Sequence, residues 1–179
     1  MKNYTTLFFL FIATISFGQI IHKRKLSMLG SPFEMTVVAK DTVQGNQYID
    51  LGIAEVKRIE YLISDWIPST QISKVNQNAG IKPIKVDKEV YDLVERAIKV
   101  SQITSGAFDI SYASMDKIWK FDGSMKQMPT EEAIKKSISK IGYKNIILDP
   151  KGQTIFLRKE GMKLGLGGIG QGYIADKVK

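Results

Sequence analysis

Residues 145–158, which read NIILDPKGQTIFLR, decide the fold class of this chain. Two short runs rich in isoleucine, leucine and phenylalanine, residues 145–148 and 154–158, flank Asp149-Pro150-Lys151-Gly152. Proline fixes the backbone of a turn, and a glycine soon after it is typical of turns, so the stretch predicts a β-hairpin. This antiparallel hairpin, taken together with the elements that precede it, determines the fold class.

Helical periodicity dominates the sequence before the hairpin. Apolar residues at helical spacing predict a helix over residues 47–64. They predict a second helix that follows the capping residue Asp87 and ends before Gly106, and a third from the capping residue Thr130 to Gly142. Three helices followed by a hairpin predict an α+β fold, with helices packed on a mainly antiparallel sheet, rather than an alternating βαβ fold.

Shorter elements complete this outline. Valines over residues 33–39 favour a strand, and residues 107–111 and 162–166 predict two more short strands. Proline, glycine and small polar residues over 65–85 predict a long loop, and loops of that length are often functional.

The chain has 179 residues with a formal net charge of +8, and 44% of its residues are hydrophobic. This composition is typical of a globular domain and excludes a disordered, collagen-like or low-complexity protein. There is no cysteine, and we interpret the one histidine, His22, as an exposed residue near the N-terminus. A disulfide framework, a thiol nucleophile and a cysteine-ligated or multi-histidine metal site are therefore excluded.

The N-terminal segment has the pattern of a secretory signal peptide. Lys2 precedes an apolar run over residues 7–17, and small residues follow at the expected cleavage site. We expect residues 1–18 to be the signal and residues 19–179 to form one domain. The run is shorter than the roughly 20 apolar residues that span a bilayer, although a permanent signal anchor is the alternative. A lipid-anchored bacterial precursor would require a cysteine just after the run, and there is none.

Export predicts a location in the periplasm or at the outer face of the cytoplasmic membrane, with only indirect membrane association. The positive charge does not indicate nucleic acid as a partner. Basic and acidic residues alternate along the chain, as in Glu55-Val56-Lys57-Arg58-Ile59-Glu60, which is typical of a solvated face rather than of a dense basic surface.

The sequence GLGGIGQG over residues 165–172 is rich in glycine, and we expect a helix to begin near Tyr173. Unhindered N–H groups beside a helix N-terminus suit phosphate, but a tight structural turn explains the glycines as well, and the residues alone leave both readings open. A Rossmann motif would need an acidic residue about 20 positions later, and a P-loop would need Lys followed by Ser or Thr. The helical pattern has run about two turns when the sequence stops, so we expect the chain to be part of a longer protein.

Four motifs in a fixed order carry a resemblance to a known family. They are Met28-Leu29-Gly30-Ser31-Pro32-Phe33; Ile63-Ser64-Asp65-Trp66 leading to Ser73-Lys74-Val75-Asn76; Ser105-Gly106-Ala107-Phe108-Asp109-Ile110; and Gly167-Gly168-Ile169-Gly170-Gln171-Gly172-Tyr173 with Asp176. Together they resemble the ApbE family of FAD:protein FMN transferases from Met28 to the last residue. The resemblance implies an exported protein that binds FAD with Mg²⁺ and attaches FMN to a Ser or Thr of an acceptor protein through a phosphoester, releasing AMP.

The resemblance also implies the ligand contacts. Gly165 is a cofactor-binding position where many members carry an aspartate, so one polar contact to FAD is missing or rebuilt. Gly168 matches a position that gives an oxygen to Mg²⁺, which in glycine must be the backbone carbonyl, and the remaining metal ligands of the family lie beyond residue 179. Asn76 is a weaker candidate for a cofactor contact. The positions that match flavin-contacting residues are Met28, Trp66, Ala107, Phe108, Asp109 and Gln171.

In the implied reaction the attacking hydroxyl belongs to the acceptor, so we assign no catalytic nucleophile to this chain. Two other functions stay open from the residues. One is an exported FAD-binding protein without transferase activity. The other is a non-enzymatic envelope domain in which the glycine-rich turn is structural, Trp66 and Phe108 are core residues, and Asp109 forms a turn.

Overall fold

The structure is a computed structural model that describes residues 18–115, 117–119 and 122–179. Apart from Gly18, the predicted signal peptide lies outside the described residues, and so do Lys120 and Phe121. The chain forms two compact units that meet in sequence between Glu55 and Val56, inside one long helix. The single domain expected over residues 19–179 stays a prediction.

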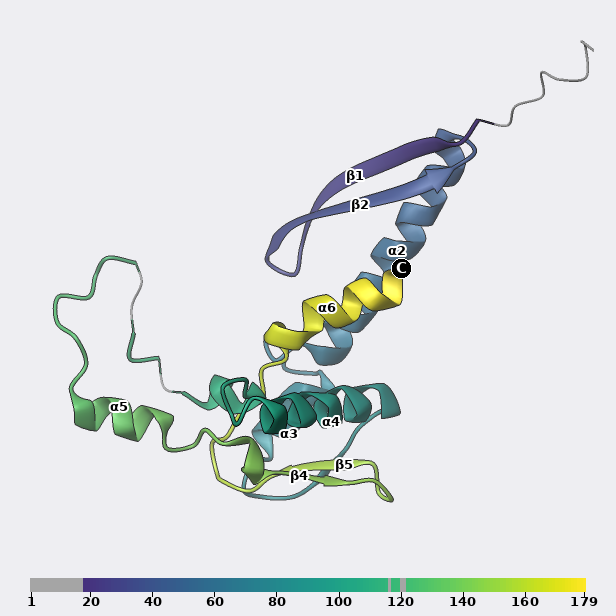
Figure 1. The fold of residues 1–179 in the computed structure, drawn as a ribbon. Coiled ribbons are helices and arrows are strands. Elements are labelled where there is room, and N and C mark those ends of the chain that lie inside the picture. The colour runs from purple at the N-terminus through teal and green to yellow at the C-terminus, as the bar shows by residue number, and fades with distance from the viewer. Residues whose placement is uncertain (1–17, 116, 120–121) are drawn as a thin grey trace, which may run out of the picture. The chain divides into compact units, whose positions relative to one another are not determined.

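A β-hairpin and the start of a helix make up the N-terminal unit. Strands β1 (Ile20–Met28) and β2 (Ser31–Ala39) pair antiparallel from Ile20↔Ala39 to Met28↔Ser31. Leu29 and Gly30 join them with φ values of 55° and 70°, the left-handed backbone of a two-residue hairpin turn. The hairpin lies along the N-terminal half of helix α2 (Thr42–Ile63) (Figure 1).

The sequence analysis predicted only β2 of this hairpin, because basic residues occupy inward positions of β1. Arg24 donates to Asp50 Oδ1 at 2.5 Å and to Asn46 Oδ1 at 2.6 Å, so its charge is compensated by α2. The interpretation of His22 as exposed was wrong: it is half-buried, and its Nε2 lies 3.0 Å from Asn46 Oδ1.

Helix α2 begins five residues before the predicted start at residue 47. The backbone N–H of Gln44 donates to Asp41 Oδ1 at 2.8 Å, so Asp41 caps the first turn. Gly45 in that turn is required by close packing, since a Cβ there would lie 2.8 Å from the Cβ of His22.

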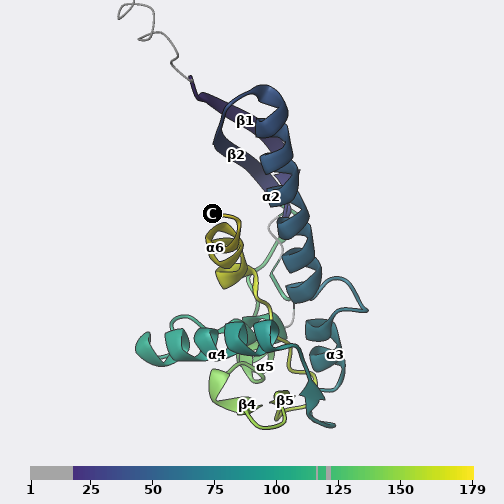
Figure 2. The same ribbon diagram turned by 90° about the vertical axis from the view of Figure 1, so that its right-hand side faces the viewer.

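The C-terminal unit combines helices with a small antiparallel sheet. Strands β3 (Ile84–Lys85) and β4 (Ile146–Asp149) flank β5 (Thr154–Leu157) in the order β3-β5-β4. The predicted hairpin is thus confirmed as β4 and β5. It lies beside helix α4 (Lys88–Ile103) in both views (Figures 1 and 2). Buried apolar side chains of the sheet and α4 form the core, among them Val86, Val90, Leu93, Val94, Ala97, Ile146, Ile155 and Leu157.

The predicted loop over residues 65–85 contains both β3 and a short helix, α3 (Gln71–Gln77). Thr70 caps α3, because its Oγ1 accepts from the N–H of Ser73 at 3.1 Å and donates to the carbonyl of Ser64 at 2.5 Å. Such a short helix has too few residues for a periodic signal, and it is held by this cap and by packing on β5.

Asp87 precedes α4 as predicted, but its side chain does not cap the helix. The carboxylate instead accepts from Gln71 Nε2 at 2.5 Å, and the Asp87 N–H donates to Gln71 Oε1 at 2.6 Å. The prediction for the next helix is confirmed at its start: Thr130 Oγ1 accepts from the N–H of Ala133 at the start of α5 (Glu131–Ile138). The 3₁₀ turn η3 (Tyr143–Asn145) then leads into β4.

Two strand predictions were wrong. Residues 107–111 lead into the 3₁₀ helix η2 (Ile110–Ser114), because the Asp109 carboxylate caps that turn. Residues 162–166 belong to no strand, and helix α6 (Gly167–Val178) begins directly after them, six residues before the expected start at Tyr173. The α+β fold class with antiparallel sheets is nevertheless confirmed. Within the described residues, none of the helices combines the length and apolar character that crossing a bilayer requires.

Candidate functional site

A pocket of about 530 Å³ in the C-terminal unit is the candidate site. Its walls come from the loop after α2, from α3, from η2 and the residues that follow it, and from the segment 162–166. The lining residues are Asp65, Trp66, Pro68, Ser73, Asn76, Gln77, Tyr112, Ala113, Met115, Lys117 and Lys163.

Trp66 presents an aromatic face at this pocket. Its side chain is 79% exposed, which is unusual for the largest aromatic residue, and Lys117 Nζ lies 5.0 Å from the ring centroid. A cation over an exposed indole is a weak interaction that a flat ligand can replace by stacking. Trp66 is therefore available to a ligand, in keeping with its predicted role.

The segment 162–166 is held mainly by side chains, although the N–H of Gly165 also donates to the carbonyl of Ile110 at 2.9 Å. Asn76 Nδ2 donates to the carbonyl of Leu164 at 3.1 Å, and the N–H of Leu164 donates to Asn76 Oδ1 at 2.8 Å. Ser114 Oγ likewise donates to the carbonyl of Lys163 at 3.0 Å and accepts from its N–H at 2.8 Å. The amide of Asn76 is thus occupied by the backbone, and its part in the site is to fix this wall.

The Asp109 carboxylate is also engaged with the protein. Oδ1 accepts from the N–H and the hydroxyl of Ser111 at 2.8 and 2.6 Å, and Oδ2 accepts from the N–H of Tyr143 at 2.7 Å. These bonds stabilise η2 and join it to residues 142–143, where Gly142 N–H also donates to Ser111 Oγ at 2.8 Å. These bonds establish a structural role for Asp109. A contact from Asp109 to FAD stays a prediction.

The glycine-rich turn passes behind the pocket. A Cβ on Gly165 would lie 3.0 Å from the Cβ of Ala113 and 3.2 Å from the hydroxyl of Tyr112, so this position has no room for a larger residue unless its neighbours shift. Gly167 lies near the same hydroxyl, at 3.8 Å from a constructed Cβ. Tyr112 therefore reaches from the pocket to the start of α6, beside the position where the family resemblance leads us to expect an aspartate.

The structure brings several predicted residues near one another. A Cβ on Gly168 would lie 3.3 Å from Cε2 of Phe108, so the 107–109 segment contacts the first turn of α6. Ala107, Gly168 and Gln171 are exposed. Met28 lies at the end of β1 in the N-terminal unit, so its contact with the cofactor stays a prediction.

Several pocket residues were not singled out as ligand contacts in the sequence. Ser73 Oγ is buried and has no hydrogen-bond partner among the described residues, so a polar atom of a ligand could satisfy it. Lys117 and Lys163 add positive charge at the rim, beside Asp65. Ser73 stands in one of the quoted motifs, whereas no pattern in the sequence distinguishes the two lysines from the other lysines.

The described residues contain no group of three or more histidine, aspartate or glutamate side chains that could surround a metal ion. Gly168, the predicted Mg²⁺ ligand, offers a backbone carbonyl only. Mg²⁺ in proteins is often held by one or two carboxylates together with substrate phosphates and water. The described residues therefore do not form a metal cage by themselves.

Comparisons with known proteins agree with the resemblance to the ApbE family. Residues 29–179 match the ApbE family. A FAD:protein FMN transferase of Klebsiella pneumoniae (strain 342) is 28% identical over 152 residues, which is 85% of this chain and 47% of that protein. One of Treponema pallidum (strain Nichols) is 27% identical over 124 residues, 66% of this chain and 34% of that protein. The chain therefore spans about half or less of the length of the curated relatives it matches.

Solved structures share the fold. The crystal structure of the ApbE protein from Thermotoga maritima superposes with a TM-score of 0.77 and 27% identity, over 89% of this chain and 51% of that one. The flavinyl transferase ApbE of Pseudomonas stutzeri in its apo form gives a TM-score of 0.74 at 19% identity over the same shares, a likeness that concerns the fold alone.

Proposed function

The chain belongs to the ApbE family, and from this premise we propose that the full-length protein is a FAD:protein FMN transferase. The observation that carries the proposal is the pocket lined by both Trp66, whose side chain is exposed, and Tyr112, whose hydroxyl reaches the glycine-rich start of α6. An aromatic surface suits a flavin ring, and unhindered N–H groups at a helix start suit phosphate.

In the proposed reaction, a Ser or Thr hydroxyl of the acceptor protein attacks the flavin-side phosphorus of FAD. The new bond joins this phosphorus to the acceptor oxygen, the pyrophosphate P–O bond breaks, AMP leaves, and the hydroxyl proton is released. Phosphoryl transfer of this kind depends on positioning and on neutralising charge more than on a protein nucleophile. The chain's own residues therefore act by binding and orienting FAD.

Mg²⁺ is part of the proposal and would neutralise charge on the phosphates. Its support is family membership and the chemistry of the reaction. Gly168 supplies one candidate oxygen, and the phosphates of FAD would supply others.

We also propose that the protein is exported and acts in the periplasm or at the outer face of the cytoplasmic membrane. The support is the sequence of residues 1–18, with one lysine before an apolar run. A fusion of this segment to a reporter that is active only outside the cytoplasm tests the proposal, and a silent reporter contradicts it.

The transferase proposal is tested by mixing the full-length protein with FAD, Mg²⁺ and a candidate acceptor. An acceptor mass increased by one FMN less one water is the expected result, since the phosphoester forms as AMP leaves. Trp66→Ala should weaken FAD binding about tenfold or more, because base–aromatic stacking contributes about 1–3 kcal/mol. Tyr61→Ala is the matched control, since Tyr61 is an exposed aromatic residue of α2 outside the pocket. Bound FAD without a mass gain favours a binding protein, and absence of FAD binding contradicts both flavin functions.

A further inference from the structure

Helix α6 has weak intrinsic stability for a helix that carries predicted ligand contacts. Its twelve residues read GGIGQGYIADKV, and each interior glycine costs about 1 kcal/mol relative to alanine. Its buried residues are Gly170 and Ile174, so few apolar side chains anchor it. The orientation of α6 must therefore depend on additional contacts.

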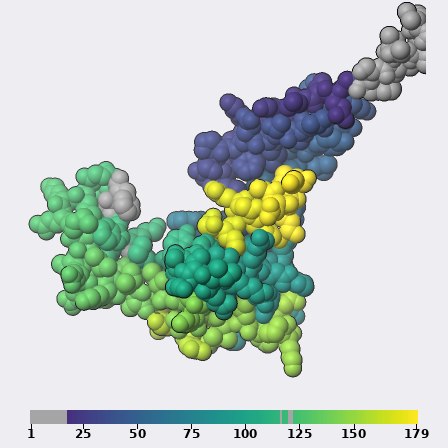
Figure 3. All heavy atoms as spheres, viewed as in Figure 1, coloured from purple at the N-terminus to yellow at the C-terminus, as the bar shows by residue number. Residues whose placement is uncertain are grey.

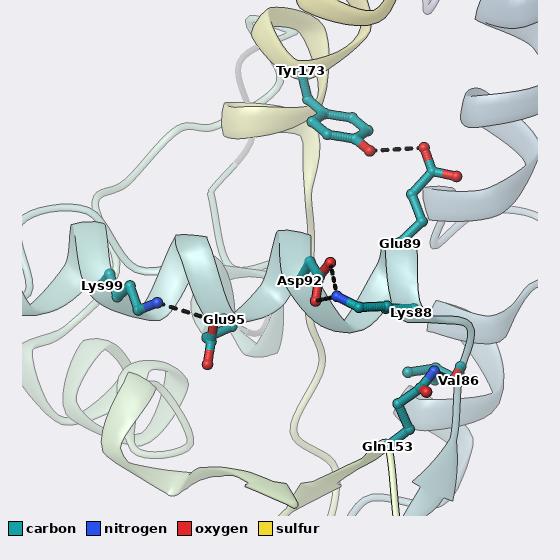
Figure 4. Close-up of polar contacts among 8 residues, drawn as sticks. All are labelled: Val86, Lys88, Glu89, Asp92, Glu95, Lys99, Gln153 and Tyr173. Carbon is teal, nitrogen blue, oxygen red and sulfur yellow. Dashed lines mark hydrogen bonds and ion pairs between the residues drawn. The ribbon is translucent and has the colours of Figure 1, made fainter. Parts of the chain in front are cut away.

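Tyr173 provides such a contact. Its hydroxyl donates to Glu89 Oε1 at 2.7 Å, and Figure 4 shows the tyrosine reaching from α6 to the first turn of α4. The space-filling view shows the atoms of α6 directly against those of α4 (yellow and teal in Figure 3). Glu89 is also held by Arg58 of α2, whose Nη1 donates to Oε2 at 2.8 Å and whose Nη2 donates to Oε1 at 2.9 Å.

The charge states of this network match its geometry. The Arg58 guanidinium holds the pKa of the Glu89 carboxyl below its ordinary value, so this acceptor is an anion at neutral pH. Burial, and then the neighbouring Glu89 carboxylate, raise the pKa of Tyr173, which therefore stays a neutral donor. Lys177, one turn further along α6, lies over the Tyr173 ring with Nζ 5.4 Å from the centroid. A hydrogen bond from a neutral donor to a charged acceptor is about twice as strong as one between neutral groups.

We propose that Tyr173, Glu89 and Arg58 are positioning residues that fix the orientation of α6 and thereby of Gly168 and Gln171 toward FAD. The inference rests on the proposed function. Tyr173 follows Gly168 by five residues, about 7.5 Å along a helix, and Gln171 by two. A rotation of a glycine-rich helix about its axis would move both predicted contacts together, and the Tyr173 hydroxyl bond opposes that rotation.

The test uses the full-length protein with Tyr173→Phe, Glu89→Gln and the double variant. Tyr61→Phe is the matched control, because it likewise removes a tyrosine hydroxyl, one that contacts Ser69 Oγ at an exposed site. We expect Tyr173→Phe to raise the Kd and the KM for FAD about tenfold, equivalent to 1.4 kcal/mol, with kcat changed less than twofold. Glu89→Gln keeps an acceptor for the tyrosine and should show a smaller increase. The double variant should be no more than twofold weaker than Tyr173→Phe.

A purely structural role predicts a different pattern. Lower thermal stability of Tyr173→Phe with an unchanged Kd for FAD overturns the proposal, and so does an effect equal to that of Tyr61→Phe. Failure of wild-type protein to bind FAD contradicts the proposed function instead. In that case amide hydrogen exchange, which needs no ligand, still tests whether Tyr173 fixes α6. We expect faster exchange over α6 in Tyr173→Phe, and unchanged exchange refutes the positioning role.

Discussion

Asn76 should be the side chain on which the wall of the pocket depends most. Its amide group makes two hydrogen bonds to the backbone of Leu164, a residue with 0% exposure that lies 88 positions later in the sequence. The geometry imitates one rung of a β-ladder, because the amide donates to the carbonyl and accepts from the N–H of the same residue. Asn76→Ala removes both bonds at once.

The magnitude follows from the groups left behind. An unsatisfied buried donor or acceptor costs about 1–3 kcal/mol. Two such groups give about 2–4 kcal/mol, since water from the adjoining pocket can replace part of the loss. Asn76→Asp keeps the acceptor for the Leu164 N–H but places a carboxylate oxygen against the Leu164 carbonyl, so we expect it to be at least as destabilising.

Urea unfolding of the full-length protein measures this loss as a change in the free energy of unfolding. Asn78→Ala is the matched control, because Asn78 lies two residues away and its side-chain amide donates to the local carbonyl of Lys74 at 2.8 Å. We expect that variant to lose less than about 1 kcal/mol. If the two alanine variants differ by less than about 0.5 kcal/mol, the reasoning that side chains hold the segment is refuted.

Three further predictions concern α6 and its surroundings. Gly172→Ala should stabilise the protein by about 0.5–1 kcal/mol, because its Cβ meets nothing within 4 Å. Gly170→Ala should stabilise it less, because its Cβ would lie 2.7 Å from Ile63 Cδ1 and that side chain must shift; thermal unfolding of the pair checks the difference. Asp109→Ala should lower the free energy of unfolding by about 2–3 kcal/mol, because the backbone N–H groups of Ser111 and Tyr143 lose their carboxylate acceptor, and an unchanged Kd for FAD would remove Asp109 from the ligand site. The pKa of Glu89 is lowered in the folded protein, so the unfolded chain binds a proton at Glu89 more readily than the folded protein does. The stabilisation that ionised Glu89 contributes is therefore present above pH 4.5, the ordinary pKa, and is lost as the pH falls below it. Glu89→Gln should therefore flatten the acid side of the stability curve, and an unaltered curve contradicts the assignment.

The sequence predicted those elements whose signal is local. The β4–β5 hairpin followed from Pro150 and Gly152, and the start of α5 followed from Thr130, because turn and cap residues act on their immediate neighbours. In these cases the chemistry of a few adjacent residues determines the structure. Trp66 and Asn76, which stand in the quoted family motifs, line one pocket, and their contacts with FAD stay predictions.

The missed features depend on contacts between distant residues. The charge of Arg24 in β1 is compensated by Asp50 of α2. A pattern of alternating apolar residues cannot reveal such a partner. Residues 162–166 have the composition of a strand, but Asn76 and Ser114 satisfy their backbone instead of a partner strand. The glycines at the start of α6 suggested a longer turn, whereas packing against Phe108 and Ile63 allows a helix there. Periodicity cannot show which remote group satisfies a backbone amide.

The bond between Asn76 and Leu164 also bears on the order in which the C-terminal unit is completed. Helical contacts within α3 and α4 join near neighbours, whereas this bond closes a loop of 88 residues. Closing a long loop has an entropic cost before any contact is gained, so such contacts form late. A nascent chain has no complete pocket until Leu164 has been synthesised and docked. The pocket is therefore a product of finished folding, and no peptide around Trp66 that ends before Leu164 would reproduce it.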